Sequence, residues 1–218
     1  MTGYVRKPLL RRSVVAILFL LGVSLTPVAA REPSQLLEQR WQVALLEGKP
    51  ACHMHHTCVQ QGDRITTSDK MELTIRRGPM TISLQTTSEF IETAAGKPIE
   101  ARSTQKFATM EIATTLRFSD DQVEIISSQG GQIHKRLEPM PKEKWLTPVA
   151  AQRYVEEQIA SGAQTFSYRS MRAELGSQLM EISATRIGPE NAEVMGKVVP
   201  ATAWNAVVTP PGIPTRLW

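Results

Sequence analysis

The sequence predicts a mainly β protein: a curved, meander-like antiparallel sheet or open half-barrel with one covering α-helix at about residues 147–161. Apolar and polar residues alternate with period two, as in Met71-Glu72-Leu73-Thr74-Ile75 and again over residues 80–85 and 110–118. Turn-forming residues separate these runs at positions 62–63, 95–98, 120–121 and 130–131. Strands with one polar and one apolar face, at such short spacing, are typical of antiparallel sheets.

One segment departs from the alternation. Thr147-Pro148 has the form of an N-cap followed by proline at the first helical position, and Gly162 is placed to end the helix. The apolar residues between them recur at helical spacing, so we expect this helix to cover one face or end of the sheet. Residues 31–39 are predicted to form a short leader or helical turn.

The first thirty residues predict export. Four basic residues precede the uncharged apolar run Ser13–Leu25, and small residues follow it before Ala30. This is the pattern of a secretory signal peptide, so we expect residues 1–30 to be a signal peptide and residues 31–218 to be one β-rich domain in the periplasm or outside the cell. An uncleaved membrane anchor is the alternative, although the run is short for a spanning helix.

Charge argues against nucleic acid as a partner. Removing the four basic residues of the first thirty from the chain's 25 leaves 21 basic against 21 acidic residues. Positive and negative side chains alternate along this part, whereas a nucleic-acid-binding domain gathers positive charge on one face.

Several segments resemble a known family. They are Trp41 through Gly48-Lys49 into the His55 region, MELTIRRGPMTISLQTTSEF at 71–90, QTFSYRS at 164–170 and PGIPTRLW at 211–218. In their order they resemble the β-rich N-terminal module of secreted bacterial transglutaminase-like proteins. The resemblance implies a catalytic domain beyond Trp218, so the chain is expected to be truncated at its C-terminus or to bind a catalytic domain or another protein in the same compartment.

Catalysis by this chain is not expected. A transglutaminase-like site needs Cys, His and Asp in that order, and no Asp follows Asp121. Other nucleophile, metal and nucleotide motifs are missing as well. We therefore predict neither a catalytic residue nor a cofactor.

The segment CHMHHTC, residues 52–58, holds both cysteines and three of the four histidines. As a strand it spans about 20 Å, whereas a disulfide needs Cα atoms within about 7 Å, so a Cys52–Cys58 bond is not expected. Two buried free thiols are the plainest interpretation. The alternatives are a disulfide-closed loop and a metal site at His53 and His55, with His134 as a third ligand.

Three functions follow as hypotheses. The first is a non-catalytic accessory or interaction domain. The second is a carrier of a lipid or other apolar ligand on the concave face of the sheet, which requires an unfilled apolar cavity and fails if that face is packed. The third is a metal-binding protein that uses CHMHHTC.

Overall fold

The computed structural model describes residues 33–46, 49–77, 80–194, 197–210 and 212–217. The predicted signal peptide lies outside these residues. Among them, no helix combines the length and the apolar composition that crossing a bilayer requires.

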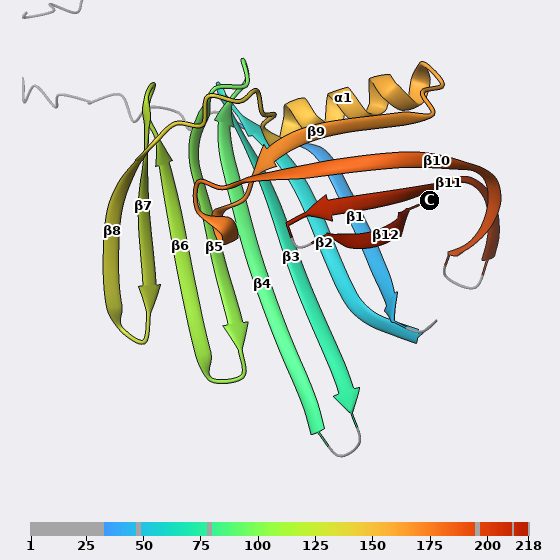
Figure 1. Ribbon diagram of the computed structural model, residues 1–218, viewed down its shortest axis with the longest axis horizontal. Helices are drawn as coiled ribbons and strands as arrows, with labels where there is room; N and C mark the ends of the chain where they lie inside the picture. The colour runs from blue at the N-terminus through green and yellow to red at the C-terminus, as the bar shows by residue number, and fades with distance from the viewer. Residues whose placement is uncertain (1–32, 47–48, 78–79, 195–196, 211, 218) are drawn as a thin grey trace, which may run out of the picture. The chain divides into compact units, whose positions relative to one another are not determined.

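Eight antiparallel strands follow one another in a single sheet, in sequence order, and Figure 1 shows them side by side in a curved surface. They are β1 Ser34–Leu46, β2 Lys49–Gln61, β3 Arg64–Arg77, β4 Met80–Thr93, β5 Pro98–Phe107, β6 Met110–Phe118, β7 Gln122–Gln129 and β8 Gln132–Pro139. Strands β1 and β8 are the two edges, and the sheet does not close into a barrel. The predicted curved meander is confirmed.

A second antiparallel sheet of four strands follows the helix α1, Pro148–Ala160. Its strands are β9 Thr165–Met171, β10 Leu179–Val194, β11 Lys197–Thr209 and β12 Ile213–Leu217, in the order β12-β11-β10-β9. A short 3-10 helix, η1 Ala173–Leu175, connects β9 to β10. In Figure 1 these strands run across the direction of the first eight.

Local turn chemistry explains why the meander stays in register. Gly130 and Gly131 form the two-residue connection between β7 and β8, with φ of 57° and 80°. A two-residue hairpin turn of this kind needs positive φ at both positions, which glycine adopts without steric cost.

Strand β1 corrects one expectation. Residues 34–39 belong to this strand, which pairs with β2, and do not form a leader or helical turn. Apolar and polar residues alternate little in β1 because the side chains on both of its faces are mostly exposed. Its strand conformation therefore depends on pairing with β2.

The predicted helix is confirmed, but its ends differ in detail. Thr147 occupies the N-cap position and Pro148 the first turn, yet the Thr147 hydroxyl does not cap the helix; it donates to Oε1 of Glu92 on β4, at 3.1 Å. The Glu92 carboxylate also accepts the backbone N–H of Val149. At the other end the C-cap is Ser161, and Gly162 with φ of 74° follows it.

Candidate functional site

The large sheet has an inner face that packs against α1, η1 and the end of β9. The central part of this face is a closed core in which Leu116 and Val123 are 0 % exposed and Ile125 is 2 % exposed. Met171 and Ala173 from the second half of the chain complete it. Three aromatic rings extend the core toward the loops: Phe90 lies 5.7 Å from Phe118 and 6.4 Å from Trp145 between ring centroids.

The strand register divides the inner face into rows that run across the sheet. The row through the closed core, which we call the core row, contains Cys58, Thr67, Phe90, Ala101, Leu116 and Ile125. The next row toward the hairpin tips, the polar row, contains Arg40, His56, Asp69, Ser88, Ser103, Thr114, Ser127 and His134. The inner face therefore changes from apolar to polar within two residues of each strand.

Beyond the polar row the inner face becomes apolar again, on the side of the β3–β4 and β5–β6 hairpin tips. The apolar side chains here, which we call the open strip, are Met54, Met71, Leu73, Leu84, Phe107, Met110 and Ile112. They are half-buried, except that Phe107 is 46 % and Met110 43 % exposed. Two polar inner-face side chains, Thr86 and Gln105, separate Met71 from Ile112. In Figure 1 strands β3 to β6 extend, on this side, beyond α1 and strands β9–β12.

Charged groups cluster at one end of the polar row. Nδ1 of His56 lies 2.7 Å from Oδ1 of Asp69, and because an ionised carboxylate only accepts, this nitrogen carries the proton. Nε2 of His56 lies 4.0 Å from Oε2 of Glu38, whose other oxygen pairs with Arg40 at 2.5 Å. Arg172, just before η1, reaches Oδ2 of Asp69 at 3.9 Å.

Several atoms near this row are buried and lack a hydrogen-bond partner among the described residues. They are Nε2 of His56, Oε2 of Glu38, Oγ of Ser103 and Oε2 of Glu174. Buried polar atoms without a partner are rare in folded proteins. These atoms are enclosed by protein, whereas Arg40 and Arg172, whose side chains are each 47 % exposed, are the groups of this cluster that a ligand can reach directly.

Asp69 makes the fold sensitive to acid. Burial alone would raise the pKa of its carboxyl, but the hydrogen bond from His56 and the positive charges of His56, Arg172 and Arg40 outweigh burial and lower the pKa. A lowered folded-state pKa stabilises the fold above the unfolded-state pKa, and this contribution is lost as pH falls through the folded-state value.

We expect Asp69→Asn to lower the free energy of unfolding by about 1–2 kcal/mol at neutral pH. The difference from the wild type should shrink below about pH 4, where the wild-type carboxyl takes up its proton. Urea denaturation of both proteins at neutral and acidic pH measures the difference in their free energies of unfolding. A difference that stays constant with pH would contradict the lowered pKa of Asp69.

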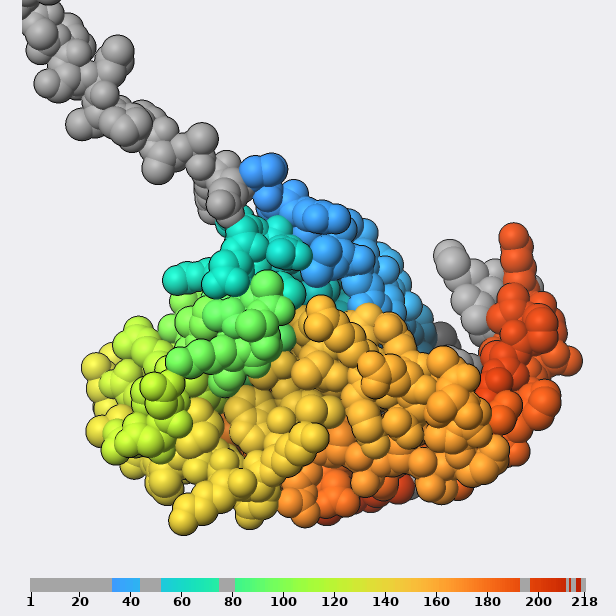
Figure 2. All heavy atoms as spheres, turned by 90° about the horizontal axis from the view of Figure 1, so that it is seen from above, coloured from blue at the N-terminus to red at the C-terminus, as the bar shows by residue number. Residues whose placement is uncertain are grey.

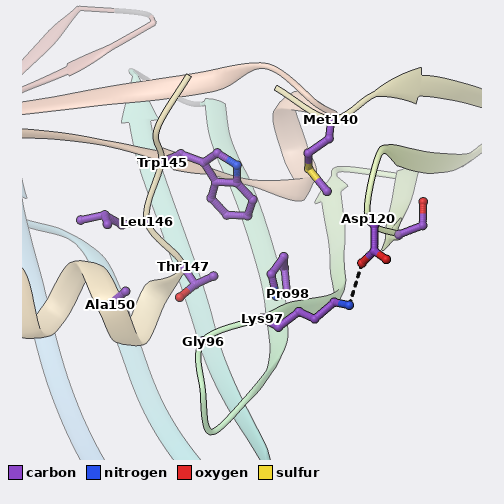
Figure 3. Close-up of a pocket in the computed structure, with 10 residues that line it drawn as sticks. Gly96, Lys97, Pro98, Asp120, Met140, Trp145, Leu146, Thr147 and Ala150 are labelled. Atoms are coloured by element: carbon purple, nitrogen blue, oxygen red, sulfur yellow. Dashed lines mark hydrogen bonds and ion pairs between the residues drawn. The ribbon is translucent and has the colours of Figure 1, made fainter. Parts of the chain in front are cut away.

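A separate pocket of about 330 Å³ lies at the opposite, loop end of the sheet, and Figure 3 shows its lining. Trp145, Met140, Leu146 and Pro98 supply apolar surface, and the exposed Lys97–Asp120 ion pair of 2.7 Å lies at its rim. Hydrogen bonding to Lys97, together with its positive charge, lowers the pKa of Asp120. Glu92, at this end of β4, and Leu84, in the open strip, are eight residues apart, which is about 26 Å along the strand.

The CHMHHTC segment is the middle of β2, and its side chains alternate between the two faces. Cys52 and Cys58 are buried on the inner face, both thiols are free, and burial raises the pKa of each. His53 and His55 lie on the outer face. The ring of His55 stacks on Trp41, with centroids 4.0 Å apart, and its Nε2 accepts a hydrogen bond from the Gln39 amide at 2.9 Å.

The structure does not bring His134 near the other two predicted ligands. It lies on β8, six strands from β2, which is about 29 Å of sheet width. It also belongs to the inner face, opposite to His53 and His55. Within the described ranges, no three His, Cys, Asp or Glu side chains are placed to hold a metal ion.

Sequence reasoning missed Glu92 and the His56–Asp69 pair. Glu92 is 1 % exposed. A charged residue that continues the inward-facing series 84, 86, 88 and 90 was a signal that could have found it. The partner of His56 depends on the register of β2 with β3, which the sequence does not specify by itself.

No protein-family model and no curated protein matches the sequence. The fold is similar to a solved structure, a β-barrel-like protein of domain of unknown function DUF1849 from Brucella abortus, with a TM-score of 0.53. The two share 10 % sequence identity, and the match covers 87 % of this chain and 88 % of the other. At this identity the comparison shows the fold alone, and the neighbour is itself a domain of unknown function.

This neighbour corrects the predicted family. The resemblance to the N-terminal module of transglutaminase-like proteins is wrong, since the solved structure found to be similar is a DUF1849 protein. Alternating strands with a few Gly, Pro and Trp positions are common to many antiparallel sheets, so they do not distinguish one family from another.

Proposed function

We propose that the protein is an exported, non-catalytic carrier that holds a lipid or another apolar ligand on the open strip of its inner face. Export is supported by the signal-peptide pattern of residues 1–30, and the non-catalytic role by the absence of nucleophile, metal and nucleotide motifs from the sequence. That it also has a protein partner in the same compartment stays a prediction.

The observation that carries the proposal is the unequal covering of the inner face. The core row is closed by α1, η1 and β9, whereas the open strip continues across five strands with its apolar side chains in contact with solvent. The packed core row rules out a ligand at the centre of the concave face, so the carrier hypothesis is restricted to the open strip. An exposed apolar surface of this kind often marks a binding site. Three of its seven residues are Met, whose flexible side chains adapt to ligands of varied shape.

The neighbouring polar row supports an amphipathic ligand. The apolar chain would lie on the open strip. The polar head would lie on the polar row, which begins two residues along each strand from Met54 and Met71, and would be near Arg40, His56 and Arg172. The half-exposed guanidinium groups of Arg40 and Arg172 would then pair with an anionic head group. The loop-end pocket fits this ligand less well because an ion pair lies at its rim.

Titration with the fluorescent fatty acid cis-parinaric acid tests the proposal. We expect saturable binding to the wild type, and Leu84→Glu should weaken it about tenfold or more because an ionised carboxylate in the strip must be desolvated. The matched control is Gln85→Glu, which adds the same charge at the next residue of β4, on the outer face. Equal binding by the two variants, or no binding by the wild type, would overturn the proposal.

A further inference from the structure

Strand β1 is an unusually exposed sheet edge, and Figure 2 shows it in blue at the surface of the molecule. It is 13 residues long, and its side chains from Ser34 to Val43 are exposed, with the exception of Glu38. Leu36 is 56 %, Trp41 71 % and Val43 53 % exposed. Natural proteins protect sheet edges by shortening them, by charge or proline, or by covering them, because a free edge pairs readily with another strand.

Trp41 is held in place although it is exposed. Its ring stacks on His55 with an angle of 17° between the planes, and His55 is in turn fixed by Gln39. An aromatic side chain that is already ordered loses little conformational entropy when it is buried by a partner. Tryptophan is also enriched among the residues that dominate protein interfaces.

The irregularities of β1 are symmetric about Trp41. The register with β2 shifts between Leu36 and Glu38 and again between Ala44 and Leu45. The stretch 38–44 between these shifts is regular, and Trp41 is its middle residue. If the partner is an antiparallel strand that is also regular over seven residues, the two regular stretches overlap fully only when the pairing is centred on Trp41.

We propose that β1 pairs with β1 of a second copy of this chain, with the two-fold axis at Trp41. This register places the two Trp41 rings together and sets Arg40 opposite Gln42 and Gln39 opposite Val43, with no like charges opposed. An axis at Arg40 would instead place two guanidinium groups opposite each other. The contact is isologous, so it closes as a dimer.

The other edge of the sheet fits a second copy less well. On β8, Ile133 and Leu137 are exposed, but Lys135 and Arg136 between them place two adjacent positive charges on this edge. A β1–β8 contact would also be head-to-tail and would extend into a filament unless the rotation closed a ring.

Light scattering after size-exclusion chromatography of the exported protein tests the proposal. We expect the wild type to be a dimer, and Trp41→Lys should raise the dimer dissociation constant about 10- to 100-fold because two Lys side chains would meet at the axis. Since Trp41 is exposed, the circular dichroism of the variant should not change. A wild type that stays monomeric at every concentration overturns the proposal.

Cross-linking tests the register. Under oxidising conditions Trp41→Cys should form a covalent dimer, whereas the control Ile133→Cys on β8 should not. The native thiols are buried and their raised pKa keeps them protonated, so they should not interfere. A dimer that cross-links through position 133, or one that persists without cross-linking at position 41, contradicts the β1–β1 contact.

Discussion

Leu116→Ala is expected to lower the free energy of unfolding by about 2–5 kcal/mol, because it leaves a cavity in a packed site. Leu116 is 0 % exposed and lies in the core row, where Met171 and Ala173 close over the sheet. The same substitution in the open strip removes the same atoms from a side chain that keeps part of its contact with water.

The matched control is Leu84→Ala, for which we expect a loss of about 1 kcal/mol or less. Chemical denaturation monitored by tryptophan fluorescence gives both values. Similar losses at the two positions would mean that the open strip is as well packed as the core row, and the proposed ligand surface would then not exist.

Glu92→Ala should lower the free energy of unfolding by about 2–4 kcal/mol, because it leaves the Thr147 hydroxyl and the Val149 N–H without their acceptor. These two groups belong to the beginning of α1, so the carboxylate joins the helix to β4. Glu92→Gln keeps one acceptor oxygen and should cost less. If both variants lower the free energy of unfolding equally, the hydrogen bonds accepted by the Glu92 side chain do not account for the loss of stability.

The pH dependence of Glu92 has the opposite sign to that of Asp69. Burial raises the pKa of Glu92, although the hydrogen bonds from Thr147 and Val149 and the charge of Arg153 act against it. A carboxyl with a raised folded-state pKa stabilises the fold below its unfolded-state pKa, and this contribution is lost as pH rises through the folded-state value. The stability of Glu92→Gln relative to the wild type should therefore increase as pH rises from about 4.

The strands of the meander were predictable because their residues alternate and their turns use Gly, as at Gly130-Gly131. The first part of strand β1, residues 34–39, was not, because an edge strand exposed on both faces leaves no period-two pattern. The helix was found from Thr147-Pro148, but the contact that docks it depends on Glu92, which is 55 residues earlier in the chain.

The site was less predictable than the fold. The sequence suggested His53 and His55 as a pair of metal ligands. In the structure it is His56 that contacts other charged groups, and its partners Glu38 and Asp69 come from the strands on either side. Such a cluster depends on the register of three strands, and the register depends on packing that a single sequence does not display.

The most direct test is the native mass of the exported protein, purified without detergent. The carrier proposal predicts a bound apolar molecule in the wild type and in Gln85→Glu, which organic extraction removes, and little of it in Leu84→Glu. An unliganded mass in the wild type, or the same bound molecule in all three proteins, would contradict the claim that the open strip is a ligand site.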